Sequence, residues 1–317
     1  MKKTWYLIIA TVLLVIGGIA YGHHEHNKPK TAQELKTVRI AYLPITHALP
    51  VFATKELETV DGPVHVELVK YGSWPELMDA LNTGKVDAAS VLVELGVKAR
   101  EQGIDVRATA LGHTEGNIII VNNDINSVQD LKGKSFAIPH KQSTQKILVD
   151  CMLEQAGLSE KDVQIVEMSP PEMPSALSVG QIAGYSVAEP FGSLALEMGT
   201  GKVFEDPDHL WHDNICCALV FNGQFVDEHH DLAKAFTKAY LDAGKYLDEH
   251  PEAQEEISLK YMKFKDPIIE RSLQVIGFRD LALTEDRYNA LVHHMTHIDL
   301  IKKVPSYSEF VDTSLLP

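Results

Sequence analysis

Two stretches of this chain carry the same local signals 96 positions apart. Residues 73–84 and 169–180 each open on a serine, place a glutamate three positions later and close on a glycine. The serine and glutamate predict a helical capping box, and the glycine predicts a helix end in the left-handed conformation. The apolar runs that follow, 86–91 and 182–187, are typical of buried parallel strands. Chance similarity is the alternative, but start and stop signals at one fixed offset favour a duplicated unit.

The residues before each stretch extend the repeat. Strands are predicted at 37–44 and 64–71 in the first copy and at 134–139 and 163–168 in the second. Each copy therefore has the order β-α-β-α-β, and right-handed crossovers give a three-layer α/β lobe with a parallel core. The C-terminal part adds helical stripes at 231–247, 251–262 and 284–302.

The duplication predicts two lobes with a ligand cleft between them. Lobe 1 covers residues 36–121 plus 221–317, and lobe 2 covers residues 122–220. The strand expected at 117–122 ends the first unit, and another strand is expected at 216–221. The chain then crosses between the lobes twice, near Asn122 and Phe221, and the two crossings form a hinge.

The chain opens with the features of an export signal. Lys2 and Lys3 precede an apolar run over 5–21, which is also just long enough to span a bilayer core of ~30 Å. We therefore expect an extracytoplasmic protein. Residues 1–22 are a signal peptide or an N-terminal membrane anchor, and residues 23–35 are a linker.

Charge and cysteine content exclude two further classes. The 29 Lys and Arg against 44 Asp and Glu leave a formal net charge of −15, and phosphate contacts need clustered cations, so nucleic acid is not an expected partner. Three cysteines cannot form a disulfide framework. We interpret the adjacent Cys216 and Cys217 as small apolar residues on a buried strand.

Ligands of parallel α/β sheets bind beyond the carboxyl ends of the strands, where helix N-termini offer free N–H groups. The loops expected there, which include 113–116, supply hydroxyls, aromatic rings and carboxylates. The candidate binding residues are Thr46, His47, Trp74, Ser90, Ser143, Thr144 and Glu189. We hypothesise that Thr46 and His47 from lobe 1 and Ser143 and Thr144 from lobe 2 hold an oxyanion between them.

Each candidate also has a purely structural interpretation. Ser143 can serve as a helix cap, and Trp74 can belong to the core. His47 can be a surface histidine, and Glu189 can be a salt-bridge partner. These alternatives stay open at the level of sequence.

Three segments resemble a known family. Residues 41–47, the Asp-Leu-Lys-Gly-Lys run at 130–134 and the Ala-Glu-Pro-Phe run at 188–191 look like the nitrate/sulfonate/taurine group of ABC-transporter substrate-binding proteins, which includes binders of thiamine-precursor pyrimidines. The similarity covers roughly residues 36–310. It implies a type II periplasmic-binding-protein fold that closes on a small ligand and delivers it to a membrane permease with a separate ATPase. By position it also implies that Thr46, His47, Ser90, Ser143, Thr144 and Glu189 line the pocket.

The expected function is therefore transport rather than catalysis. We favour a small oxyanion such as nitrate, a sulfonate or taurine as the ligand of a monomeric protein that needs no cofactor. A thiamine-precursor-type pyrimidine is the alternative. A pyrimidine-synthase-like enzyme of the same fold is a weaker one, because Cys216 and Cys217 are only part of that enzyme's cysteine motif.

Histidines give no convincing metal site at this level. The run at 23–26 carries three histidines, and His293 and His297 share one helix face. Neither set has a second cluster of carboxylates or thiolates in evident register. We therefore predict no metal in the binding site.

Overall fold

The computed structural model describes residues 36–59 and 62–317. The predicted export signal, residues 1–22, and the linker, residues 23–35, lie outside the described residues. In the part that is described, no helix is both long enough and apolar enough to cross a membrane.

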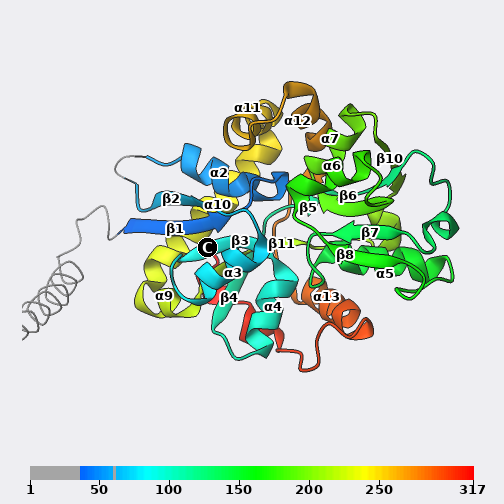
Figure 1. Cartoon of the computed structure of the whole chain (residues 1–317). Coiled ribbons are helices and arrows are strands. Elements are labelled where there is room, and N and C mark those ends of the chain that lie inside the picture. Colours follow the sequence, from blue (N-terminus) through cyan, green and yellow to red (C-terminus); the bar gives the residue numbers. More distant parts are fainter. Residues whose placement is uncertain (1–35, 60–61) are drawn as a thin grey trace, which may run out of the picture. The chain divides into compact units, whose positions relative to one another are not determined.

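One five-stranded sheet carries the first copy of the repeat, with the strand order β2-β1-β3-β11-β4. Its strands are β1 (Thr37–Tyr42), β2 (His65–Lys70), β3 (Ala88–Leu92), β4 (Val106–Leu111) and β11 (Cys217–Asn222). Helices α2 (Leu49–Glu56) and α3 (Trp74–Asn82) connect β1 to β2 and β2 to β3. β1 and β3 are parallel, whereas β11 runs antiparallel to both β3 and β4 (Figure 1).

A second five-stranded sheet carries the second copy, with the order β10-β6-β9-β7-β8. Its strands are β6 (Asn117–Asn122), β7 (Ser135–Ile138), β8 (Gln164–Glu167), β9 (Gly184–Ala188) and β10 (Gly201–Glu205). Helix α5 (Thr144–Gln155) connects β7 to β8, and a 3₁₀ turn with α6 (Met173–Ser178) connects β8 to β9. β7 pairs in parallel with β8 and β9, whereas β6 is antiparallel to β9 and β10.

The two sheets repeat the same topology. In each copy the first strand lies between the second and the third, giving β2-β1-β3 in one sheet and β8-β7-β9 in the other. Gly84 and Gly180 both have left-handed φ angles, +70° and +72°. The predicted β-α-β-α-β order and the glycine helix ends are therefore confirmed.

The predicted capping boxes are wrong. Ser73 precedes α3 and Ser169 precedes the 3₁₀ turn, but neither side chain makes a capping hydrogen bond. The Ser169 hydroxyl instead donates to the carbonyl oxygen of Gly72, at 3.4 Å. A sequence signal for a cap therefore does not guarantee the contact.

Two strands belong to different sheets from those expected. β6, assigned to the first unit from sequence, pairs with β9 and β10 of the second sheet. β11, most of which falls within the predicted lobe 2, lies between β3 and β4 of the first sheet. The chain therefore passes between the sheets before Asn117 and before Cys217. Both strands pair antiparallel with their neighbours, and an apolar run does not reveal strand direction. That the two halves move as separate lobes remains a proposal.

The predicted C-terminal helices are present. They are α10 (His230–Glu249), α11 (Pro251–Met262) and α13 (Glu285–His297), with α9 (Gly223–Glu228) and α12 (Asp266–Leu273) added to the prediction. α10 packs against α2, and α12 packs against α7 (Phe191–Glu197), which follows β9. The C-terminal helices therefore pack against one helix that follows a strand of the first sheet, α2, and one that follows a strand of the second, α7.

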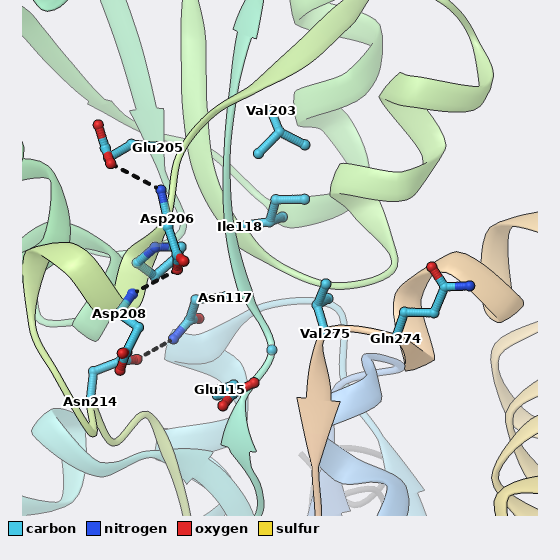
Figure 2. A pocket seen from close by; sticks show the side chains of 12 residues that line it. Glu115, Asn117, Ile118, Val203, Glu205, Asp206, Asp208, Asn214, Gln274 and Val275 are labelled. Carbon is cyan, nitrogen blue, oxygen red and sulfur yellow. Dashed lines mark hydrogen bonds between the residues drawn. The ribbon is translucent and has the colours of Figure 1, made fainter.

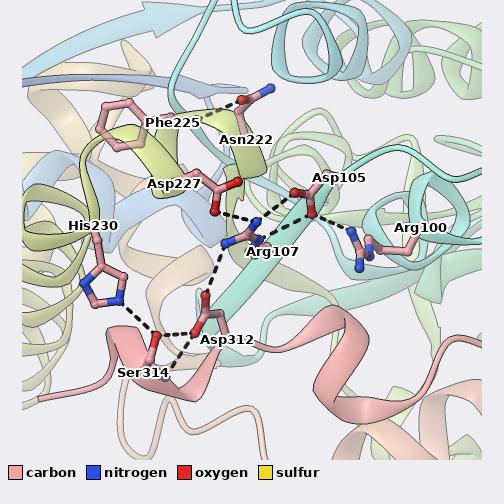
Figure 3. Close-up of polar contacts among 9 residues, drawn as sticks. All are labelled: Arg100, Asp105, Arg107, Asn222, Phe225, Asp227, His230, Asp312 and Ser314. Atoms are coloured by element: carbon pink, nitrogen blue, oxygen red, sulfur yellow. Dashed lines mark hydrogen bonds and ion pairs between the residues drawn. The ribbon is translucent and has the colours of Figure 1, made fainter.

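An arginine on β4 ties this C-terminal part to the first sheet. Arg107 pairs with Asp105 and Asp227, both at 2.8 Å, and with Asp312 at 3.8 Å. Figure 3 shows the guanidinium group between these three carboxylates. Asp105 directly precedes β4, Asp227 lies in α9, and Asp312 lies in the C-terminal turn. Arg107, by hydrogen bonding, holds the pKa of Asp105 below its ordinary value.

Glu101 anchors the segment that follows α13. Glu101 is the last residue of α4 (Val93–Glu101). Its carboxylate accepts hydrogen bonds from the backbone N–H groups of Lys302 (2.7 Å) and Lys303 (2.8 Å). It also pairs with the Lys98 side chain. The Lys98 contact and then the backbone donors lower the pKa of Glu101 to about 2.

We expect Glu101→Gln to lower the free energy of unfolding at pH 7 by about 1 kcal/mol, because the amide still accepts from the backbone but loses the attraction to Lys98. The folded pKa lies below the unfolded value of ~4.3, so this stabilisation is present above that pH and is lost as the pH falls toward the folded value. Urea denaturation at pH 7 and pH 3 measures it. Glu249→Gln, in an exposed pair with Lys245, is the control. An equal difference at both pH values would contradict the prediction.

Candidate functional site

Residues from both sheets meet at one buried polar centre. In the first sheet, the register places Cys217 beside Leu92 and Ala218 beside Leu111, so the start of antiparallel β11 lies at the edge where β3 and β4 end. The loops at this edge carry His47, Glu94, His113, Cys216 and Cys217, and all five are buried. The start of α5, which follows β7 of the second sheet, adds the buried Thr144 and Gln145.

The loop after β1 is tied directly to the second sheet. Thr46 donates to the carbonyl oxygen of Glu189 through its backbone N–H (3.0 Å) and through its hydroxyl (3.1 Å). The His47 Nε2 lies 2.9 Å from the carbonyl oxygen of Gly116, which precedes β6. The predicted loop therefore does contact the second half of the chain, but its contacts are with backbone carbonyls.

Thr144 and Glu94 form a side-chain contact between the halves. The Thr144 Oγ1 lies 2.6 Å from Glu94 Oε1 and 2.7 Å from the carbonyl oxygen of Ile215. Burial, and then the proximity of Cys216, raise the pKa of Glu94 well above its usual range. A hydroxyl has one proton and a carbonyl can only accept, so a protonated Glu94 satisfies all three groups at once.

A chain of amides continues from this contact. Gln145 Nε2 donates to Asn117 Oδ1 (2.6 Å), and Asn117 Nδ2 donates to Asn214 Oδ1 (3.1 Å). The other oxygen of Glu94 and the Gln145 Oε1 are buried and have no hydrogen-bond partner within residues 36–59 and 62–317. Buried polar atoms normally have partners, so these two mark a place where a further group can bind.

Two histidines and two cysteines form the core of the centre. The His47 and His113 rings stack with their centroids 3.6 Å apart. Cys217 Sγ lies 3.6 Å from His47 Nδ1 and 4.0 Å from Cys216 Sγ. Burial, then the neighbouring His47 ring, lowers the pKa of His113 to about 4, so this ring is neutral at pH 7.

Sequence reasoning named His47 but missed the rest of this group. It listed the loop with His113 among the candidates but interpreted Cys216 and Cys217 as apolar strand residues. The signal was present, since each residue adjoins a strand end of the first sheet. The group can be recognised only once β11 is known to run antiparallel, because this direction brings the start of β11 to the edge where β3 ends.

Two further predicted residues, Ser143 and Glu189, have structural partners. Ser143 caps α5, because its hydroxyl accepts from the Lys146 N–H (3.1 Å) and donates to the His140 carbonyl oxygen (2.6 Å). Glu189 accepts from the N–H and the hydroxyl of Ser193, both at 2.9 Å. Burial raises the pKa of Glu189, although the two Ser193 contacts oppose the shift.

Trp74 and Ser90 are both buried. The indole N–H of Trp74 has no hydrogen-bond partner in the described part of the chain. Ser90 lies on β3 opposite Leu219 of β11. The seven predicted residues are thus placed, and their role as ligand contacts remains a prediction.

A pocket of about 450 Å³ adjoins the centre through shared residues (Figure 2). Asn117 and Asn214 belong both to its lining and to the amide chain of the centre. Four carboxylates line the same pocket, those of Glu115, Glu205, Asp206 and Asp208. A pocket lined by these carboxylates favours cations or neutral ligands over multiply charged anions.

A protein-family model and several known proteins are similar to this chain in sequence. A family model described as the NMT1-like family matches residues 31–259. The nitrate import ATP-binding protein NrtC of Synechocystis sp. is 25% identical over 239 residues, which cover 68% of this chain and 36% of that protein. The putative aliphatic sulfonates-binding protein of Bacillus subtilis is 27% identical over 263 residues, covering 78% of this chain and 76% of that protein. This chain thus spans only about a third of the length of NrtC.

Solved structures share the architecture. The ligand-binding component of an ABC-type import system from Staphylococcus aureus, solved with zinc bound, is 35% identical with a TM-score of 0.84, covering 88% of this chain and 97% of that one. The periplasmic nitrate-binding protein NrtA from Synechocystis is 19% identical with a TM-score of 0.72, over 87% and 94% of the two chains, and shares the fold. The predicted resemblance and the periplasmic-binding-protein fold are confirmed. Because the binding proteins among these relatives are not enzymes, the prediction that the chain is not an enzyme is confirmed as well.

Proposed function

Because the chain belongs to the NMT1-like family, we propose that it is the extracytoplasmic substrate-binding component of an ABC importer. In this proposal it acts as a monomer and delivers a small ligand to a membrane permease with a separate ATPase. One observation carries the proposal: the buried polar centre draws side chains from both five-stranded sheets, as the Thr144–Glu94 contact does. A site assembled from two halves is complete only when the halves are closed.

Closure coupled to binding sets an energetic requirement. A ligand moves an open–closed equilibrium only by its difference in affinity for the two states, and a swing from 1:99 to 99:1 requires about 5.5 kcal/mol. Hydrogen bonds to a charged ligand contribute about 1.5–3 kcal/mol each. Two to four such bonds to groups of the centre are therefore enough.

We propose a small oxyanion with a single charge, of the nitrate, sulfonate or taurine class. Support comes from the relatives, which are named for nitrate and aliphatic sulfonates. It also comes from the donors of the centre, which are neutral: the Thr144 hydroxyl and the first turn of α5. No lysine or arginine side chain bonds to Glu94, Thr144 or Gln145 within the described ranges, so a single charge fits better than two.

The predicted residues then take two roles. Thr144 exchanges its present contacts for contacts with the ligand, and His47 lines the site beside it. Ser143, as the cap of α5, and Glu189, as the partner of Ser193, hold the surrounding elements in place. Thr46, Trp74 and Ser90 complete the walls.

Thermal denaturation of the full chain with a ligand panel tests the proposal. The panel contains nitrate, taurine, an alkanesulfonate and bicarbonate, with chloride at the same ionic strength as the control. A true ligand at 100 times its Kd stabilises the folded state by about 2.7 kcal/mol, which raises the Tm by a few degrees. If every oxyanion behaves as chloride does, the oxyanion class is wrong.

A pyrimidine of the thiamine-precursor type is the second candidate. The buried Gln145 Oε1 has no donor among the described residues and would accept a hydrogen bond from an exocyclic amine. Adding a pyrimidine of this type to the panel decides between the two, because a pyrimidine that raises the Tm where the oxyanions do not would favour this candidate.

A further inference from the structure

The four side chains at the core of the centre present an unusual set of donor atoms. His47, His113, Cys216 and Cys217 each offer one ligand atom, and these atoms all lie within 4.8 Å of one another. All four side chains are completely buried or nearly so. Two imidazoles and two thiols at this spacing are the donor set of tetrahedral zinc sites in proteins.

The histidines are oriented as metal ligands are. The His47 Nε2 faces the Gly116 carbonyl oxygen at 2.9 Å, and the His113 Nδ1 faces the Glu115 carbonyl oxygen at 2.7 Å. A carbonyl accepts only, so each of these nitrogens carries the proton. The other nitrogen of each ring is then unprotonated. His47 Nδ1 lies 3.6 Å from Cys217 Sγ, and His113 Nε2 accepts a long hydrogen bond, 3.4 Å, from the Cys217 backbone N–H, which an ion would replace. Ligating histidines typically donate their second ring N–H to a carbonyl in this way.

The distances fit a tetrahedral ion. Bond lengths of about 2.3 Å to sulfur and about 2.0–2.1 Å to nitrogen place two sulfurs roughly 3.8 Å apart and a sulfur and a nitrogen roughly 3.6 Å apart. The Cys216 and Cys217 sulfurs lie 4.0 Å apart, and Cys217 Sγ lies 3.6 Å from His47 Nδ1. These two pairs already fit, and the most distant of the four ligand atoms, up to 4.8 Å apart, would close by about 1 Å around an ion.

Charge and hydrogen bonding agree with this geometry. Two thiolates and two neutral imidazoles carry a charge of −2, which a divalent cation neutralises in a buried place. Gln145 Nε2 also lies 3.4 Å from Cys216 Sγ, where it donates to the sulfur.

We propose that His47, His113, Cys216 and Cys217 bind one zinc ion. All four ligands come from the strand ends of the first sheet, so the site does not require the second sheet to close on it. Four protein ligands leave no open coordination position, which is the arrangement of resident rather than exchanged zinc. The ion would fix the loops after β1 and β4 against the start of β11, and this role is additional to import.

Cobalt titration of the full chain tests the proposal without a variant. The chain is purified without a metal-affinity column, stripped with a chelator and titrated with Co²⁺. We expect one equivalent to produce thiolate-to-cobalt charge-transfer absorption and the strong visible bands of tetrahedral cobalt, and one equivalent of Zn²⁺ to remove both. Absence of thiolate-to-cobalt absorption would overturn the proposal.

Variants locate the ion. Cys216→Ser combined with Cys217→Ser is expected to abolish the cobalt spectrum and the bound zinc, whereas Cys151→Ser, which changes the third cysteine, keeps both. Replacing His23, His24 and His26 by alanine should also keep both. Zinc that disappears with these three histidines but survives the cysteine double variant would refute the site. The ligand panel is run on each variant, so that failure of oxyanion binding is seen separately from failure of metal binding.

Discussion

Thr144→Val is expected to lower the free energy of unfolding by about 3 kcal/mol and to weaken ligand binding. The two side chains have nearly the same shape, but valine cannot bond to Glu94 or to the Ile215 carbonyl oxygen, both of which the hydroxyl contacts at 2.6–2.7 Å. Each buried polar group that loses its partner costs about 1–3 kcal/mol. Urea denaturation and a binding titration with the best ligand of the panel measure the two effects.

Thr237→Val is the matched control. Thr237 is also fully buried, and its hydroxyl donates to the Ala233 carbonyl oxygen at 3.0 Å inside α10. That carbonyl keeps its helical backbone hydrogen bond after the substitution, so the loss should stay below about 1 kcal/mol. Equal losses for the two variants would mean that the Thr144–Glu94 contact does not hold the halves together.

Gly184→Ala is expected to destabilise the second sheet by about 3 kcal/mol or more. A Cβ at this position on β9 would lie 2.6 Å from the Phe136 ring, 2.7 Å from the Ile120 carbonyl oxygen and 2.9 Å from a Val121 methyl group. Overpacking of this kind costs about 1–3 kcal/mol, and more where the obstacle cannot move. The Ile120 carbonyl is backbone of a strand that is paired on both sides, so it cannot give way cheaply. Thermal or urea unfolding reports the loss.

Gly180→Ala separates crowding from backbone strain. Gly180 has a φ of +72° and no atom within 4 Å of an added Cβ. Its replacement therefore costs only the left-handed conformation, about 1 kcal/mol. The first copy has an alanine at the position that matches Gly184, Ala88 on β3, so the crowding belongs to the second sheet alone. A loss at Gly184 no larger than at Gly180 would contradict the packing argument.

The sequence was sufficient for the repeated unit because the signals are local. A glycine that ends a helix and an apolar run after it act through their immediate neighbours, and both copies fold as those signals predict. The predicted serine caps are wrong at Ser73 and Ser169, and the Ser169 hydroxyl instead donates to the carbonyl oxygen of the distant Gly72. A partner that lies far away in the chain cannot be predicted from a segment of a few residues.

The candidate site was predicted in part for the same reason. The loops at the strand ends, which were predicted to carry the site, do contain residues of the buried polar centre. Contacts between segments far apart in the chain involve Thr46, His47, Thr144 and Glu189. The importance of His113, Cys216 and Cys217 depends on the direction of β11, which an apolar run leaves undetermined. Glu94 was missed because a single acidic residue in the first turn of a helix usually lies at the surface, where it interacts favourably with the positive end of the helix dipole.

The place of β11 has a consequence for shortened forms of this protein. The second sheet is built from strands that lie within 117–205, so a chain that stops just beyond them contains all five. The first sheet would then lack the strand between β3 and β4, and each of these would present an unpaired edge. Unpaired edges are templates for aggregation. Proteolytic clipping or early termination ahead of Cys217 is therefore expected to yield an insoluble product rather than a smaller working one.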